Sequence, residues 1–359
     1  MGNQINCNSC GYNINQELHI QLIRNNVIVN TQEPRISMGK ETKNKRVSKF
    51  KKYSKKKTSL SRNVMVKTLS ELTNHTSNPS INIIKFKYNN YIYIGCSSQS
   101  REMINGFGIA YNDFARYVGE FDSNLAKGIG RFENENEDKI FIGEFDNNKA
   151  NGYGQLITSS KTEFEGYWKN DSQYCEGTET WIDGSKYKGC YVNGIKSGIG
   201  TYKWPDGSWY QGEWMNEEIH GWGIYSFNDG RIYKGNWSHN QMNGYGEYIF
   251  DDGKRYIGYF KKDKKHGFGI YFWPTSNQPK AYAGMWKEGK MEGYGVVYKG
   301  NILRYCKYKN GKREKIYPNE NEFWKEARKE VGNIESQFKY SMENIEGIFD
   351  DVDDDIGVN

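Results

Sequence analysis

The most constraining feature of this chain is a short unit that returns nine times between residues 93 and 304. Each copy begins with an aromatic residue, has a glycine two positions later, and recurs after 23 to 26 residues. The copies begin at Tyr93, Tyr117, Phe141, Phe164, Tyr187, Tyr210, Tyr233, Tyr256 and Tyr282. A fixed period of this length indicates an array of small units rather than one globular core.

The copy at residues 210–232 shows what one unit is expected to form. Tyr210, Gly212 and Trp214 alternate with polar residues, and a second alternating run includes Gly223. A period of two is the signature of β-strands, and the polar segment from Asn216 to His220 has the length of a hairpin connection. We therefore predict an all-β repeat array, an elongated antiparallel sheet of consecutive hairpins of ~23 residues each.

The glycine inside every first strand needs a physical reason, because glycine weakens strands. We expect aromatic rings from neighbouring strands to pack over these glycines, with ring-on-ring contacts between adjacent hairpins. A single hairpin is only marginally stable in water, so each unit is expected to depend on its neighbours.

The segments YQGEWMNEEIHGWG, YKGNWSHNQMNGYG and YAGMWKEGKMEGYG resemble the MORN motif (membrane occupation and recognition nexus). The resemblance covers about residues 91–304, and a degenerate tenth unit begins at Tyr305. The fourth unit departs from the motif, since Cys175, Glu176 and Gly177 stand where Gly-Tyr-Gly is expected. We expect a local bend or an irregular loop there. The resemblance implies a scaffold at a membrane or a cytoskeletal structure, without a particular ligand.

Sequence motifs for catalysis do not occur in the chain. It has no phosphate-binding G-x-x-x-x-G-K-[ST], no G-x-S-x-G nucleophile motif and no H-E-x-x-H zinc motif. We therefore predict a protein that is not an enzyme and has no cofactor, no catalytic residues and no metal site.

Residues 1–62 are predicted to be a disordered arm that carries a lipid anchor. Gly2 follows the initiator methionine, and Cys7 and Cys10 lie close behind. This arrangement favours myristoylation of Gly2 and palmitoylation of a cysteine, although Asn6 stands where the acylation pattern prefers Ser or Thr. Residues 1–30 contain no continuous apolar run, so we expect no cleavable signal peptide and a cytoplasmic protein on the cytosolic face of a membrane.

A basic run strengthens the prediction of a membrane anchor. Residues 40–57 hold ten Lys or Arg and one Glu, which suits anionic lipid headgroups. A single myristoyl chain binds membranes marginally and needs such a second signal. The run also suits a nuclear signal, a nucleic-acid patch or a solvated charged segment, but no nucleic-acid-binding fold accompanies it, so we expect no nucleic acid. The candidate membrane-binding residues are Lys45, Arg46, Lys49, Lys51, Lys52, Lys55, Lys56 and Lys57.

Different segments flank the array. Residues 63–90 are predicted to cap its first end, and residues 91–316 to form nine clear units and one degenerate unit. Residues 319–345 are predicted to form an amphipathic helix with Asn319 as its N-cap, followed by an acidic tail at residues 346–359. The helix is expected to cover the last hairpins, with docking to another chain as the alternative. Its apolar stripe consists of Phe323, Ala327, Val331, Ile334, Phe338, Met342 and Ile345, and Phe349 continues it into the tail.

Together these features predict a non-enzymatic scaffold at a membrane that presents a rigid sheet to a helix or an extended peptide of a protein partner. Trp214, Trp222, Trp237 and Tyr245 are the candidate partner-binding residues, because aromatic side chains dominate binding energy. A structural component of a cilium or another cytoskeletal assembly is the first alternative. A regulatory subunit of a separate enzyme is the second, and a homodimer is left open.

Overall fold

The computed structural model of the chain describes residues 82–97, 103–274, 280–300, 302–332, 336 and 338. These residues form 21 strands and one helix. The predicted arm at residues 1–62 and the predicted tail at residues 346–359 lie outside them. The chain divides into two compact units, Met1–Gly198 and Ile199–Asn359.

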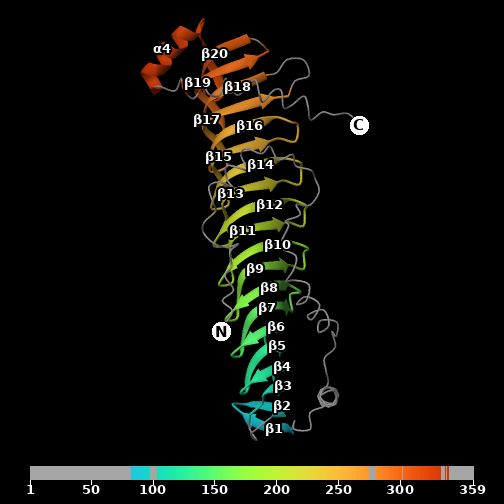
Figure 1. The fold of residues 1–359 in the computed structure, drawn as a ribbon. Helices are drawn as coiled ribbons and strands as arrows, with labels where there is room; N and C mark the ends of the chain where they lie inside the picture. Colours follow the sequence, from blue (N-terminus) through green and yellow to red (C-terminus); the bar gives the residue numbers. More distant parts are fainter. Residues whose placement is uncertain are drawn as a thin grey trace. The chain divides into compact units, whose positions relative to one another are not determined.

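In the first unit, each strand pairs antiparallel with the next strand in the chain (Figure 1). β1 belongs to the segment predicted as a cap, and it adds a strand before the first repeat. The strands are β1 (Asn82–Tyr88), β2 (Tyr91–Ser97), β3 (Gly106–Tyr111), β4 (Ala115–Asp122), β5 (Leu125–Asn134), β6 (Lys139–Asp146), β7 (Lys149–Thr158), β8 (Glu163–Lys169), β9 (Ser172–Thr180) and β10 (Lys186–Val192). The boundary between the units lies inside β11 (Ile195–Lys203).

The second unit follows the same rule from β12 onward and ends in the helix α4 (Glu320–Val331). The predicted all-β array of antiparallel hairpins is therefore confirmed. Its strands are β12 (Trp209–Met215), β13 (Glu218–Ser226), β14 (Ile232–Ser238), β15 (Gln241–Ile249), β16 (Arg255–Lys261), β17 (Lys264–Trp273), β18 (Lys280–Lys287), β19 (Lys290–Lys299), β20 (Ile302–Lys309) and β21 (Lys312–Ile316).

From β4 onward, the two strands of each repeat are joined by a turn of two residues. Asn216 and Glu217, between β12 and β13, have φ angles of 51° and 70°, which is the left-handed pair of a type I′ turn. The sequence suggested a longer polar connection that reached His220. That expectation is wrong because β13 already begins at Glu218.

Side chains in the turns join neighbouring hairpins. The Asn240 carboxamide oxygen accepts a hydrogen bond from the Ile219 amide at 2.8 Å, and the Asp263 carboxylate accepts one from the Met242 amide at the same distance. Each bond runs from a turn to the start of the second strand of the preceding hairpin, so it fixes the spacing between consecutive turns.

The two glycines of each Gly-x-Gly segment have different roles. Gly221 has a φ of 59° and lies in a bulge where the register between β12 and β13 shifts after Gly212; this conformation favours glycine. Gly223 lies directly across from Gly212. A Cβ atom on Gly223 would lie 2.4 Å from the Tyr210 hydroxyl oxygen, so the second glycine makes room for a ring.

The ring over the first-strand glycine comes from its own strand. Tyr210 lies over Gly212, two residues further along β12, and also over Gly223 across the hairpin. The expectation that a neighbouring strand supplies the ring over Gly212 is therefore wrong. The Tyr210 hydroxyl donates a hydrogen bond to the Glu213 carbonyl at 2.9 Å, so the ring is fixed at the bulge.

The predicted ring-on-ring contacts between adjacent hairpins are confirmed. Tyr210, Trp237, Tyr233 and Phe260 pack edge to face in succession, with centroid distances of 5.0 to 5.7 Å and interplanar angles of 82 to 88°. This geometry matches the quadrupole of aromatic rings. We call the side of the sheet that carries these rings the aromatic face, and the other side the opposite face. The first unit repeats the pattern with Tyr117, Phe145, Phe141 and Trp168.

The fourth unit keeps the hairpin geometry although its sequence departs from the motif. β8 and β9 show the usual register shift after Gly166, and Gly177 lies across from Gly166 beneath the ring of Phe164. Cys175 has a φ of 64° and takes the place that a glycine has in the other units. The expectation of a bend or an irregular loop is wrong here, because the pairing of β8 with β9 follows the pattern of the other units.

α4 begins as predicted and ends earlier. The Asn319 side chain accepts a hydrogen bond from the Glu322 amide at 3.0 Å, which is the expected N-cap. α4 ends at Val331, and Gly332 follows with a φ of 77°, a backbone conformation that favours glycine. The predicted helix at residues 319–345 therefore has its first continuous segment at Glu320–Val331, and residues 339–345 lie outside the described part of the chain.

The apolar stripe predicted for α4 is partly buried. Phe323, Ala327 and Phe338 are fully buried, whereas Val331 is half exposed. Trp324 is also buried, although the stripe did not include it. Its indole N–H donates a hydrogen bond to the Glu320 carboxylate at 2.8 Å. The polar edge of the ring therefore has a hydrogen-bond partner, while the apolar part belongs to the core between the helix and the sheet.

Candidate functional site

Two of the four predicted partner-binding residues lie inside the aromatic face. Trp214 and Trp237 are each 7% exposed. The Trp237 indole N–H donates to the Gly223 carbonyl, and the Trp214 indole N–H donates to the Gly200 carbonyl, both at 3.3 Å. Each bond connects a ring to the preceding strand, so these two residues hold consecutive hairpins together.

The other two predicted residues, Trp222 and Tyr245, lie on the opposite face. Tyr245 is 54% exposed, and Trp222 is half-buried. Tyr259 lies directly across from Tyr245 on β16 and is 52% exposed. The two rings meet edge to face with centroids 5.5 Å apart. Sequence reasoning missed Tyr259, whose signal is its place between Gly258 and Phe260, out of phase with the buried positions.

Trp222 and Tyr245 belong to a larger row. They stand between the two glycines of their Gly-x-Gly segments, and Phe268 and Tyr294 hold the same position in the next two hairpins. Register places each of them on the opposite face. We call Trp222, Tyr245, Phe268 and Tyr294 the opposite-face row.

α4 and Phe338, which follows it in the chain, cover one half of the opposite-face row. Phe323 packs on Tyr294 with centroids 5.6 Å apart, and Phe338 packs on Phe268 at 4.9 Å. Ile270 and Val296 complete the apolar core beneath the helix. This finding agrees with the expectation that the helix covers the last hairpins, and it leaves Tyr245 exposed at the other half of the row.

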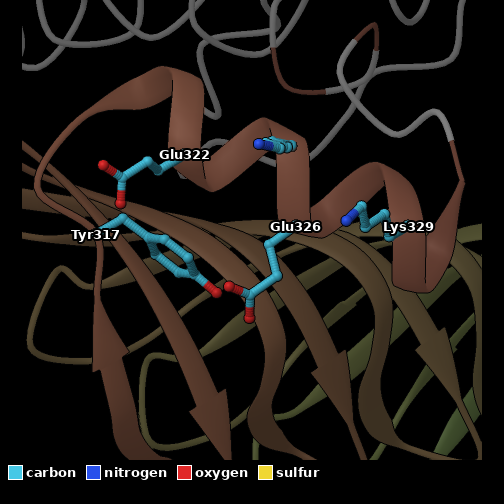
Figure 2. Close-up of a pocket in the computed structure, with 5 residues that line it drawn as sticks. Tyr317, Glu322, Glu326 and Lys329 are labelled. Atoms are coloured by element: carbon cyan, nitrogen blue, oxygen red, sulfur yellow. The ribbon is translucent and has the colours of Figure 1, made fainter.

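The charged side of α4 faces a small hollow beside the end of β21. Figure 2 shows the Glu326 carboxylate directed at the hydroxyl of Tyr317, with Glu322 and Lys329 further along the helix. Lys325 also lines this hollow. Burial raises the pKa of Tyr317, so its hydroxyl stays neutral near pH 7.

A lysine lies among the rings of the aromatic face. The Lys265 ammonium is 4.3 Å from the ring centre of Tyr271, 4.9 Å from Trp286, 5.1 Å from Phe250 and 5.3 Å from Tyr256. Burial lowers the pKa of Lys265 to about 8, because the charged form loses hydration there. Cation–π attraction offsets part of this loss. We call Lys265 and these four rings the Lys265 cage.

The predicted membrane anchor lies outside the described residues. This holds for Gly2, Cys7 and Cys10 and for the basic residues between Lys45 and Lys57, so their role stays a prediction. Within the part of the chain that the structure describes, no helix has the length and apolarity needed to cross a membrane.

The model of the MORN repeat family matches six segments of the chain. They are residues 141–162, 187–209, 210–230, 233–255, 256–278 and 282–301. These six segments are MORN repeats. Every matched segment begins at a predicted repeat start. The predicted units at Tyr93, Tyr117 and Phe164 are not among the matches, although β2–β3, β4–β5 and β8–β9 form hairpins with the same glycine pairing.

Comparison with other known proteins adds little. No curated protein matches the chain. Among solved structures, the chain is similar to the TCP domain of SAS-4 (dCPAP) from Drosophila melanogaster, which was solved in complex with a proline-rich motif of Ana2 (dSTIL). The two are 10% identical, the match covers 46% of this chain and 84% of that chain, and the TM-score is 0.28. A likeness of that degree supports no inference about this protein.

The MORN repeats next to the Lys265 cage have an apolar residue at the position of Lys265. Met242 and Met291 hold that position in the adjacent hairpins, across from the second ring of the repeat. Lys196 holds it in the first unit, with its ammonium 3.8 Å from the Glu179 carboxylate. Among the described residues, Lys265 has no carboxylate partner.

We predict that the Lys265→Met variant is more stable than the parent chain at pH 7, by roughly 1–2 kcal/mol. The pKa of Lys265 is about 8 in the folded chain and about 10.4 in an unfolded one. Between these values the unfolded state binds more protons, so the free energy of unfolding of the parent rises with pH. Urea unfolding at several pH values from 7 to 10 measures the difference between the two proteins, which is expected to shrink as the pH rises.

Lys264→Met is the matched control, because Lys264 is exposed and lies 2.7 Å from the Glu288 carboxylate. This variant is expected to follow the pH profile of the parent. A constant difference between the parent and Lys265→Met across this range would contradict the role assigned to the Lys265 cage.

Proposed function

We propose that the MORN array is a non-enzymatic scaffold whose opposite face binds an amphipathic helix of a protein partner. The observation that carries this proposal is the docking of α4 and of Phe338 beyond it, which places Phe323 and Phe338 on one half of the opposite-face row. Tyr245 and Trp222 continue the same row, and Tyr259 packs beside it. A surface that already receives one amphipathic helix has the chemistry to receive a second one.

The surroundings of Tyr245 and Tyr259 support this role. Exposed aromatic rings supply much of the binding energy at protein interfaces, and a polar rim usually surrounds them. Arg255 donates a hydrogen bond to the Glu247 carboxylate at 2.9 Å, and Lys234 lies 3.9 Å from the same group. These charged residues lie on the opposite face beside the tyrosine pair, and they would fix the orientation of a partner helix with complementary charge.

We also propose that the N-terminal arm holds this scaffold at the cytosolic face of a membrane. The support comes from the sequence: Gly2 would carry a myristoyl chain, Cys7 or Cys10 would carry a palmitoyl chain, and residues 40–57 would contact anionic lipid. Two acyl chains and a basic run provide the stable anchoring that one myristoyl chain does not.

The Tyr245→Ala/Tyr259→Ala variant tests the partner site. Proteins that the full chain captures by proximity labelling are first identified, and their predicted amphipathic helices are then titrated as purified peptides by calorimetry. We expect the double variant to bind the helix at least about tenfold more weakly than the parent, since aromatic anchors typically contribute 2 kcal/mol or more.

The Tyr153→Ala/Tyr167→Ala variant is the matched control. These tyrosines pack edge to face at the same register in the first unit, with centroids 5.4 Å apart. The control is expected to keep the affinity of the parent. If every helix binds Tyr245→Ala/Tyr259→Ala as tightly as the parent, the proposed site is wrong.

The Gly2→Ala/Cys7→Ser/Cys10→Ser variant tests the anchor. Without acylation, the basic run alone should leave the chain mostly in the soluble fraction, whereas the parent should float with membranes in a density gradient. A variant that stays in a detergent-resistant pellet together with the parent would contradict lipid anchoring and favour the cytoskeletal alternative.

A further inference from the structure

The Lys265 cage has a chemical property that a binding scaffold does not use. Lys265 lies on the aromatic face, whereas the proposed partner site lies on the opposite face. We propose that Lys265 is an acylation site, where its amine takes an acyl group from an acyl thioester.

Within the described part of the chain, Lys265 lacks the counter-ion that the corresponding lysine of the first unit has. In the first unit, the Glu179 carboxylate accompanies the ammonium of Lys196. Register places Tyr248 at the corresponding position beside the Lys265 cage, since each of these residues lies across from the first ring of the next repeat. The repeat around Lys265 therefore has an aromatic residue where the other lysine has its carboxylate, and no described residue forms an ion pair with Lys265.

The Lys265 amine is surrounded by aromatic rings. The four rings around Lys265 supply two titratable groups, the hydroxyls of Tyr256 and Tyr271. The Tyr256 hydroxyl donates to the Tyr259 carbonyl at 3.0 Å, and desolvation raises the pKa of both tyrosines. Both hydroxyls therefore stay neutral near pH 7, and neither supplies the negative charge that would hold a proton on Lys265.

The reactivity of the amine follows from this setting. With a pKa of about 8, roughly a fifth of Lys265 is uncharged at pH 7.4, against roughly a thousandth of an ordinary lysine. The uncharged amine is the nucleophile. Lys265 is half-buried, so part of its side chain is open to solvent, and a small acyl donor would approach from that side.

The reaction balances without a redox partner. Lys265 first releases its ammonium proton to solvent. The nitrogen lone pair then attacks the thioester carbonyl carbon, a C–N bond forms, and the C–S bond breaks with its electron pair leaving on sulfur as thiolate. The amide nitrogen loses a second proton, which solvent or the thiolate takes.

The product suits its surroundings better than the ammonium does. Acylation removes a charge from a position that Met242 and Met291 occupy in the adjacent hairpins. The uncharged side chain keeps its aliphatic stem against the rings and needs no counter-ion. Acylated chains are therefore expected to unfold at a higher urea concentration than unmodified chains near pH 7.

The test is competitive acetylation of the folded full-length chain. The chain is incubated with S-acetyl-N-acetylcysteamine at pH 7.4, and acetylation of each lysine is followed by peptide mass spectrometry. We expect Lys265 to react at least tenfold faster than its neighbour Lys264, which is ion-paired with Glu288. The rate at Lys265 should level off above about pH 8, while the rate at Lys264 continues to rise.

Two controls make the result decisive. Lys265→Met, checked for folding by circular dichroism, should lose the fast signal and keep the slow ones. In urea at a concentration that unfolds the chain, Lys265 and Lys264 should react alike. The proposal is overturned if Lys265 reacts no faster than Lys264 in the folded chain, or if its advantage persists after unfolding.

Discussion

The contact on which the structure depends is an aromatic ring that lies over two glycines on adjacent strands. In the repeat that begins at Tyr256, the ring of this tyrosine covers Gly258 and Gly269. A Cβ atom on either glycine would lie within 2.7 Å of the Tyr256 hydroxyl oxygen. Because glycine has no side chain, the ring lies directly on the backbone and meets Phe260 and Trp286 edge to face. Each hairpin thereby gains its stability from its neighbours.

The same contact gives the two faces of the sheet different roles. Rings on the aromatic face, such as Trp237, are buried in the contacts that join consecutive hairpins. The opposite face is therefore available for docking, as the contacts of Phe323 in α4 and of Phe338 beyond it show. Lys265 is a local departure from the ring pattern, since it introduces a charge where the adjacent repeats have methionine. That departure gives the aromatic face a chemical property that packing alone does not require.

Much of this architecture could be predicted from the sequence because the repeat restates the same constraint nine times. The hairpin class, the glycine requirement and the Asn319 cap all follow from local patterns. Which tryptophan faces the core does not, because the bulge at Gly221 inserts extra residues and breaks simple alternation before Trp222. The interruption of the predicted helix at Gly332 was missed because the apolar spacing continues past this residue. Tyr259 was missed because its importance depends on Tyr245 across the strand pair.

A double-mutant cycle between Tyr233 and Gly246 tests the central contact most directly. A Cβ atom on Gly246 would lie 2.5 Å from the Tyr233 hydroxyl oxygen, and the glycine does not have a positive φ, so alanine probes the contact alone. Urea unfolding should show that Gly246→Ala costs about 1–3 kcal/mol in the parent chain. In a Tyr233→Ala background, the same change should cost less than about 0.5 kcal/mol, because the ring is gone. An equal cost in both backgrounds would contradict the account.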